Sequence, residues 1–430
     1  MQEITFIGKT TFRNELKKFG IKKEDRKKHI LIIGKTGMGK TELLLNMAFQ
    51  DIKKGYGIGF FDPHGEAAER LLDFIPQKRI NDVIYFNPAD YDFPLAFNVF
   101  ERIKPQRRYL VVSYLINVFK RIWSDVWSSS LEYILGNCIL ALLEYPTSTI
   151  IGIYRILTDD FYRKKVVEKI TDPLVKSFWL QEFPEYFERE KDTISTIKNK
   201  MGQIVFNPVI RNIVCQIKSK IDFCDVLNKR KILIANLSRA KIGEENSELL
   251  GSFLFLRIHL ATLRRSSLPP QKREDFYLYL DEFYHFVSKN FATFLADARR
   301  YNVSLTLSHQ YFGQLEQITP FGKSEELKTA LLGNVGTIIS FRVGAEDASV
   351  LEKEFGFEFK ASDFTNLPKY EMYVKLMVNG TATRGFSAIS LPPIPTPKES
   401  FREKIIKVVR ERYTTPREIV EKKMKKLVPL

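Results

Sequence analysis

The sequence predicts an α/β fold in which a mostly parallel central sheet carries an inserted all-α domain. Seven short runs rich in Ile, Val, Phe and Tyr recur along the chain, and helical patterns separate most of them. Between residues 100 and 225 these runs stop, and segments with a 3.6-residue period replace them. The length of 430 residues is too great for one ordinary domain and sufficient for two.

The apolar runs are continuous rather than alternating, as expected for parallel strands that are covered on both faces. The predicted strands are residues 29–34, 57–62, 82–87, 231–237, 276–281, 303–308 and 337–343. Residues 370–391 predict an antiparallel hairpin, because Asn379-Gly380 suits a two-residue turn. The segment PPIPTP (392–397) predicts a stiff linker before a basic helical tail.

Helical stretches in the middle of the chain, such as 128–145 and 192–206, indicate a domain inserted into the sheet domain. No internal repeat or low-complexity segment interrupts this pattern. We expect three parts. They are a sheet domain at 1–100 and 226–395, a helical insertion at 101–225, and a basic tail at 396–430.

The charge balance favours a polyanionic partner. Lys and Arg number 67 against 51 Asp and Glu, so the formal net charge is +16. Residues 8–30 hold nine Lys/Arg and three acids, and residues 398–430 hold eleven and five, so each segment contributes +6. Such an excess points to nucleic acid ahead of a membrane surface, with a plain solvated surface as the alternative.

The cysteine count and the hydropathy argue for a cytoplasmic protein. Three cysteines without metal-ligand spacing cannot form a disulfide framework. The N-terminal residues lack the apolar core of a signal peptide. The most apolar segment, 249–263, is too short to span a bilayer and contains Arg257 and His259.

The most specific signal is a phosphate-binding loop of the pattern GxxxxGK[ST], which runs from Gly34 to Thr41 between a predicted strand and a helical run. Its glycines let backbone N–H groups surround phosphates, and the helix N-terminus adds favourable partial charge. We expect Lys40 to reach the β- and γ-phosphates of ATP and Thr41 to bind Mg²⁺. The expected nucleotide-binding residues of the loop are Gly34, Thr36, Gly37, Met38, Gly39, Lys40 and Thr41.

An acidic pair, Asp281 and Glu282, ends the strand predicted at 276–281. We expect Asp281 to hold Mg²⁺ and Glu282 to orient and deprotonate the attacking water. A solvated strand end is the alternative, but the phosphate loop favours a catalytic pair. The glutamate indicates a hydrolase rather than a kinase.

Two further polar clusters follow predicted strands, whose carboxyl ends face the ligand crevice in a parallel sheet. The segment DPHGE places Asp62 and Glu66 there, and we expect both near the γ-phosphate or its water. A Pro-Gly turn with incidental acids is the alternative, and a lone histidine such as His64 is expected to be structural. Gln310 has the chemistry to contact the γ-phosphate, with an ordinary strand-end amide as the alternative.

Arg299, Arg300 and Arg342 are candidates for an arginine finger. A guanidinium in that role neutralises charge in the transition state, often from a neighbouring subunit. For each of the three, a surface role is the alternative.

The order of these motifs resembles the HerA/FtsK superfamily of P-loop ATPases. The phosphate loop, DPHGE, a helical insertion, YLDE and ARRYNVSLTLSHQ follow one another as in that superfamily. Further matching segments include RINDVIYFNPAD, ILIANLSRAKIGEENSELLGSFL and RERYTTPREIVE, so the likeness covers nearly the whole chain. Within the superfamily, the chain looks most like the TraG/TraD-like coupling ATPases that transfer DNA in conjugation by type IV secretion.

This resemblance implies a RecA-like motor that hydrolyses ATP with Mg²⁺ and pumps DNA through a homo-oligomeric ring, commonly a hexamer. It implies that the helical insertion lies at the cytoplasmic mouth of the ring, where substrate is selected. It favours Arg342 as the finger over Arg299 and Arg300. It supports the roles given above to Lys40, Thr41, Asp281, Glu282 and Gln310, and it places Asp62 and Glu66 beside them.

One departure concerns the membrane. Coupling proteins usually begin with transmembrane helices, whereas this sequence starts about 30 residues before its first core strand, which begins at residue 29. We therefore expect contact with the inner face of the membrane only through partners, such as a relaxase or secretion-channel proteins. A secretion or pilus-assembly ATPase acting on protein, a HerA-like DNA-processing motor and an ATP-gated adaptor are the alternatives.

Overall fold

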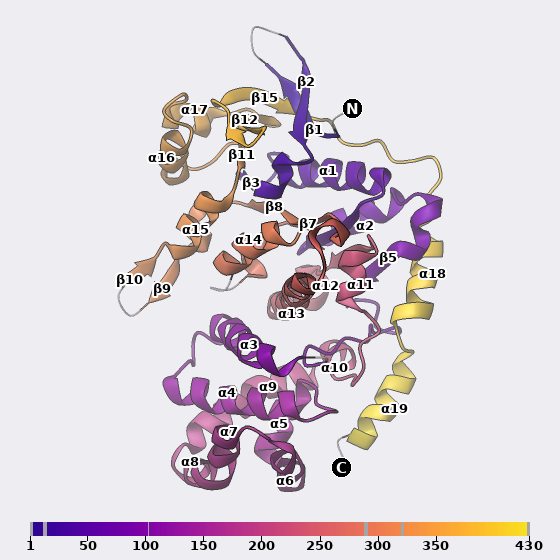
Figure 1. Cartoon of the computed structure of the whole chain (residues 1–430), viewed down its shortest axis with the longest axis vertical. Coiled ribbons are helices and arrows are strands. Elements are labelled where there is room, and N and C mark those ends of the chain that lie inside the picture. Colours follow the sequence, from indigo (N-terminus) through magenta and orange to yellow (C-terminus); the bar gives the residue numbers. More distant parts are fainter. Residues whose placement is uncertain (1–2, 12–14, 102, 288–290, 320–321, 428–430) are drawn as a thin grey trace. The chain divides into compact units, whose positions relative to one another are not determined.

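A computed structural model describes residues 3–11, 15–101, 103–287, 291–319 and 322–427 (Figure 1). Internal contacts divide the chain into two compact units. The first comprises Met1–Phe86, Phe223–Ser238 and Ile258–Val408, and the second comprises Asn87–Asp222, Arg239–Arg257 and Val409–Leu430. The three-part division expected from the sequence stays a prediction.

The first unit is built on an eleven-stranded sheet in the order β2-β1-β15-β12-β11-β3-β8-β7-β4-β6-β5. Its parallel part contains all seven strands expected from the apolar runs, which confirms that part of the prediction. These strands are β3 (Ile30–Ile33), β4 (Gly57–Asp62), β5 (Val83–Phe86), β6 (Ile232–Asn236), β7 (Phe276–Leu280), β8 (Val303–His309) and β11 (Thr337–Ser340). Every residue in them is buried, as expected for strands covered on both faces.

The other edge of the sheet is antiparallel. It consists of β1 (Ile4–Thr10), β2 (Lys18–Lys22), β12 (Glu371–Lys375) and β15 (Phe386–Ser390). The expected hairpin is present, and Asn379 and Gly380 take left-handed φ values of 50° and 80° between β13 (Met377–Val378) and β14 (Thr381–Ala382). The sequence predicts no strand before residue 29, whereas the structure has β1 there and also β2, which lies within the basic segment 8–30.

Helices pack on this sheet and set the positions of the strand ends. α1 contacts β1, β4 and β7, and α14 contacts β8. The helices that lie wholly in the first unit are α1 (Lys40–Lys54), α2 (Glu66–Asp73), α11 (Phe223–Asn228), α14 (Phe291–Arg300), α15 (Glu326–Asn334), α16 (Ala345–Glu354) and α17 (Ala361–Asn366). A small ribbon of β9 (Gln317–Thr319) and β10 (Gly322–Ser324) is separate from the main sheet.

A fully buried ion pair ties several of these elements together. Arg26 donates to both carboxylate oxygens of Asp51, at 2.7 and 2.9 Å, and their side chains are 2% and 0% exposed. The Tyr279 hydroxyl lies 2.8 Å from Arg26 Nη2 and 2.5 Å from Asp51 Oδ2. The Arg26 guanidinium also stacks over the ring of Tyr277. We call these four residues the amino-end cluster, because Tyr279 is level with the start of β3.

The second unit is helical, and its described residues contain no strand. Side-chain caps begin several of its helices, since Ser128 accepts from Leu131 N and Asp159 accepts from Tyr162 N. The helical stretches expected at 128–145 and 192–206 are confirmed as α4 and α9. The helices are α3 (Arg108–Ile122), α4 (Ser129–Glu144), α5 (Ile151–Thr158), α6 (Asp160–Lys169), α7 (Pro173–Ser177), α8 (Phe183–Arg189), α9 (Lys191–Phe206), α10 (Pro208–Val214), α12 (Arg239–Ile242) and α19 (Arg417–Leu427).

Two helices, α13 (Glu244–Arg264) and α18 (Arg402–Tyr413), contain residues of both units. The tail expected to be helical therefore consists of α18 and α19. Across the described part of the chain, no helix combines the length and the apolar character needed to cross a membrane.

Candidate nucleotide-binding site

The phosphate loop connects β3 to α1 at the carboxyl edge of the parallel sheet. Gly37 and Gly39 have φ values of 78° and 118°, in the region that favours glycine. A Cβ on Gly39 would also approach the Tyr370 ring to 3.0 Å. α1 begins at Lys40, and Gly39 at its N-cap has no side chain to bond the first N–H groups of the helix. This loop can therefore wrap phosphate oxygens and direct the helix N-terminus at them.

Lys40 is held inside this loop. Its ammonium donates to the carbonyl oxygens of Gly34 and Lys35, at 2.6 and 3.1 Å, and only 7% of the residue is exposed. Burial lowers the pKa of Lys40, while Asp281 and Glu282 act in the opposite direction. The ammonium thus lies where phosphate oxygens are expected, with two carboxylates nearby.

Thr41 and Asp281 form the oxygen-rich part of the site. The Thr41 hydroxyl donates to Asp281 Oδ2 at 2.7 Å, although 240 residues separate the two positions. The Ser308 hydroxyl, from the end of β8, donates to Asp281 Oδ1. A hydroxyl beside a carboxylate is a suitable donor set for Mg²⁺, which prefers hard oxygen ligands and keeps several waters. These residues therefore fit the ion that the phosphate loop implies.

Glu282 follows β7 in a left-handed conformation, with φ 44° and ψ 53°, which is uncommon for a residue with a side chain. Its carboxylate accepts a 2.6 Å hydrogen bond from the Gln310 amide. His64 Nε2 lies 3.2 Å from Oε1, and His285 Nε2 lies 3.4 Å from Oε2. Burial alone would raise the pKa of Glu282, but these donors hold it well below its usual range, so the group is a carboxylate.

Asp62 and Glu66 behave differently from each other. Asp62 is fully buried, and its two oxygens accept the backbone N–H groups of His64 and Ala68 at 2.8 and 2.9 Å. Burial raises the pKa of Asp62, and nearby Asp281 adds to that effect. Glu66 is exposed at the start of α2. Asp62 thus shapes the turn, and direct roles for both acids on the nucleotide stay predictions.

A sequence model of the type IV secretion-system coupling protein DNA-binding domain matches residues 13–359. The chain belongs to this family. The resemblance to TraG/TraD-like coupling ATPases is therefore confirmed, whereas a search of curated proteins returned no match.

Solved structures agree on the fold of this coupling-protein chain. Plasmid coupling protein TrwB in complex with a non-hydrolysable GTP analogue is 15% identical, covers 88% of each chain and has a TM-score of 0.62. TrwB in complex with ADP and Mg²⁺ is 14% identical, with 89% and 90% coverage and a TM-score of 0.62. VirB4 of Thermoanaerobacter pseudethanolicus is 13% identical, with 91% and 96% coverage and a TM-score of 0.59. The expected P-loop α/β fold with a helical domain is confirmed.

The three candidate arginines of this coupling protein lie at two different edges of its sheet. Arg342 follows β11, and its carbonyl accepts from Lys35 N at 2.8 Å, so it lies beside the phosphate loop of its own chain. Arg299 and Arg300 are exposed at the end of α14, just before β8 begins, which is the opposite edge. This placement favours Arg342 for contact with the chain's own nucleotide, and the finger assignment stays a prediction.

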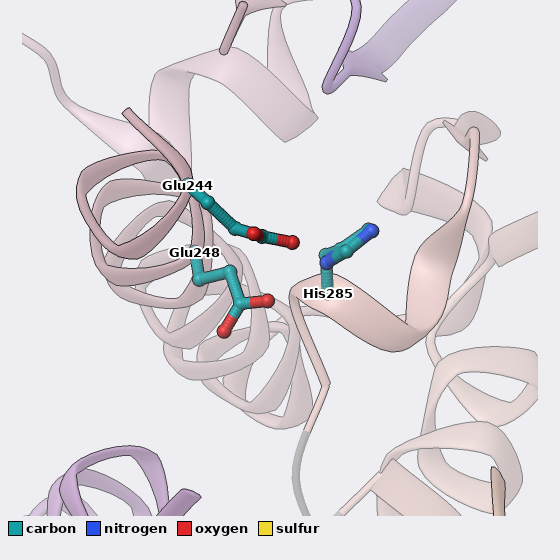
Figure 2. A group of neighbouring side chains, drawn as sticks. All are labelled: Glu244, Glu248 and His285. Carbon is teal, nitrogen blue, oxygen red and sulfur yellow. The ribbon is translucent and has the colours of Figure 1, made fainter. Parts of the chain in front are cut away.

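Three side chains contact the acidic pair in ways that the sequence does not predict: His64, His285 and Ser308. The sequence predicts His64 to be structural, yet it contacts Glu282. His285 lies on the short 3-10 helix η8 (Phe283–His285), three residues after Glu282 (Figure 2). Figure 2 also labels two glutamates one turn apart at the start of α13, Glu244 and Glu248, which belong to the second unit.

Proposed function

We propose that this coupling-protein chain is a Mg²⁺-dependent ATPase that translocates DNA through a homo-oligomeric ring, in type IV secretion or a related DNA transfer. The observation that carries the proposal is the convergence of Lys40, Thr41 and the Asp281-Glu282 pair at one edge of the sheet. The hydrogen bond of 2.7 Å between Thr41 and Asp281 joins the phosphate loop to the acidic strand.

Each residue has a role that its position supports. Backbone N–H groups of the loop and the Lys40 ammonium bind the phosphates, and Thr41 and Asp281 hold Mg²⁺. The ion supplies charge stabilisation at the phosphate oxygens. Glu282 is a carboxylate and accepts the proton of the attacking water, while Gln310 fixes one of its oxygens. TrwB structures with ADP and Mg²⁺, and with a non-hydrolysable ATP analogue, support the choice of ligands.

DNA as the translocated polymer is supported by the family, which is described by its DNA-binding domain, and by the net charge of +16. Positive charge neutralises phosphates and releases their counterions. A hexameric ring and a place at the inner face of the membrane, through a relaxase or secretion-channel proteins, complete the proposal.

The test is ATP hydrolysis by the assembled protein with and without single- and double-stranded DNA. We expect DNA to stimulate turnover, and its affinity to fall steeply with salt because phosphate contacts dominate. Lys40→Ala should abolish nucleotide binding, and Glu282→Gln should retain binding while slowing hydrolysis about 10²–10⁴-fold. If DNA does not change the rate of ATP hydrolysis by an assembled ring, the translocase proposal is wrong.

A second candidate is a secretion ATPase that acts on protein, since a phosphate loop joined to an acidic pair serves ATP hydrolysis whichever polymer is moved. The same variants serve both candidates, because both need hydrolysis. Stimulation by a protein component of the secretion channel, without stimulation by DNA, would favour the second.

A further inference from the structure

The position of the Glu282 carboxylate is set by side chains from neighbouring strands rather than by its own backbone element. Glu282 follows the last residue of β7 and lies in a left-handed conformation that neither a strand nor a helix provides. Its N–H is directed at Asp281 Oδ1 and Ser308 Oγ, at 3.2 and 3.3 Å. The backbone is therefore anchored, and the contacts of the carboxylate decide which way its oxygens face.

Two donors share one oxygen of that carboxylate. Gln310 Nε2 lies 2.6 Å and His64 Nε2 3.2 Å from Glu282 Oε1, whereas His285 approaches Oε2. Gln310 follows β8 and His64 follows β4, the two strands that flank β7 in the sheet. Glu282 is thus held from both sides, and the loss of either donor leaves this oxygen with one fewer contact to fix its orientation.

The turn that carries His64 is built around the buried carboxylate of Asp62. Asp62 accepts the His64 N–H at 2.8 Å and the Ala68 N–H at 2.9 Å, which fixes the path of the backbone on both sides of Gly65. Gly65 has a φ of 92°, and a Cβ there would meet Asn236 Oδ1 at 2.6 Å. The buried carboxylate and the glycine together hold His64 at the carboxyl edge.

Stability alone does not account for this contact. The His64 side chain is 51% exposed, and a pair with one exposed partner contributes little to folding. His285 is 2% exposed and already places a donor beside Glu282 from inside the fold. The half-exposed His64 instead lies where it can act on the orientation of the catalytic carboxylate.

We propose that His64 is a positioning residue for Glu282, which acts with Gln310 to hold the carboxylate in the orientation from which it takes the proton of water. This inference rests on the proposed hydrolytic role of Glu282. It gives His64 no contact with nucleotide or metal, so its loss should change the rate of hydrolysis and not the binding of ATP.

The experiment is a double-mutant cycle on the full chain in its assembled form. His64→Ala should lower kcat about 10-fold to 100-fold, as expected for a misplaced catalytic group, with an unchanged KM and an unchanged Kd for a non-hydrolysable ATP analogue. His64→Gln replaces the imidazole N–H by an amide N–H donor and should restore part of the kcat that is lost in His64→Ala. In the Glu282→Gln background, His64→Ala should have no further effect, because it acts through Glu282.

Arg70→Ala is the matched control, because Arg70 forms a half-exposed ion pair with Glu42 from the helix that follows the same turn. It should leave kcat unchanged. An unchanged or raised kcat in His64→Ala, or an equal loss in the Glu282→Gln background, would overturn the inference. If Glu282→Gln itself hydrolyses ATP at the wild-type rate, the proposed function fails and not the inference alone.

Discussion

The two edges of the parallel sheet use charged side chains in opposite ways. At the amino edge, the charges of the amino-end cluster pair inside the fold, since Arg26 donates two hydrogen bonds to Asp51. At the carboxyl edge, Lys40 bonds carbonyl oxygens of its own loop, and Thr41 bonds Asp281. Phosphate oxygens can replace the carbonyl oxygens as acceptors for Lys40, and Mg²⁺ can bind the oxygens of Thr41 and Asp281 in place of the hydrogen bond between them.

The comparison separates stability from function. Burial alone would lower the pKa of Arg26, but Asp51 and Tyr279 raise it above its usual range, so the amino-end pair stays charged. Such a pair is costly to break on one side only, because the remaining charge is buried without a partner. The carboxyl-edge groups Lys40, Asp281 and Glu282 are also buried, but their partners are ones that a ligand can replace.

The largest expected effect is the loss of one member of the amino-end cluster. Arg26→Ala leaves the buried carboxylate of Asp51 without its cation, although the Tyr279 hydroxyl still donates to it, so we expect the free energy of unfolding to fall by about 3–5 kcal/mol. Denaturant unfolding followed by circular dichroism measures this. The Kd of the remaining folded protein for an ATP analogue should be unchanged, since no ligand atom is expected at this edge.

A double variant provides the control. Arg26→Met with Asp51→Leu replaces both charges by apolar groups of similar size and should recover most of the lost stability. If Arg26→Ala is no less stable than wild type, or if it weakens nucleotide binding in the folded protein, the distinction between the two edges is wrong.

How far the sequence predicts this molecule follows from where each element lies. The parallel strands were predictable because burial on both faces makes them continuous apolar runs, such as ILII in β3. β1 and β2 were not, because their outer faces are partly exposed and the segment is rich in lysine, which fits a solvated surface equally well. The hairpin at Asn379-Gly380 was predictable because few residue pairs suit its turn.

The residues of the site also divide into those that the sequence predicts and those that it does not. The phosphate loop and the Asp281-Glu282 pair are local motifs, so the sequence alone predicts their chemistry. The contacts of His64 and Ser308 depend on the lateral order β8-β7-β4, which brings their strand ends together. Local sequence does not encode that order, and a single histidine or serine after an apolar run carries no signal of its own.

A smaller effect is expected at the carboxyl edge. Ser308→Ala removes the hydroxyl that donates to Asp281, and we expect a loss of about 1–2 kcal/mol in the free energy of unfolding. Because Asp281 Oδ1 then loses one of its donors, its orientation towards Thr41 is less fixed, and the Mg²⁺ concentration for half-maximal ATPase activity should rise. Titration of Mg²⁺ at a fixed ATP concentration measures this half-maximal concentration.

Ser340→Ala is the matched control for this variant. Ser340 is also buried, ends β11 and bonds the carbonyl of Phe341. It should leave the Mg²⁺ titration unchanged. If Ser308→Ala and the wild type depend on Mg²⁺ in the same way, Ser308 contributes to packing and does not orient Asp281.

An effect that is absent at neutral pH concerns His29, which precedes β3 at the amino edge and is 1% exposed. Its Nε2 lies 2.8 Å from the Leu295 carbonyl, and its Nδ1 accepts the Leu305 N–H at 3.1 Å. The ring must be neutral to accept that N–H, and burial lowers the pKa of His29 to about 4.

Because the pKa of His29 is lower in the folded than in the unfolded chain, the unfolded chain binds the proton more tightly. Its contribution to stability is therefore fully present above about pH 6.5 and is lost as the pH falls towards 4. We expect His29→Gln, whose amide can replace both hydrogen bonds, to flatten the pH dependence of unfolding by about 1.4 kcal/mol per pH unit in this window. His309, buried at the other edge with a pKa lowered to about 3, still titrates in that variant, so some slope should persist. A variant with the full wild-type slope would mean that His29 does not titrate on unfolding, and the amino edge would then owe its stability to the ion pair and its apolar packing.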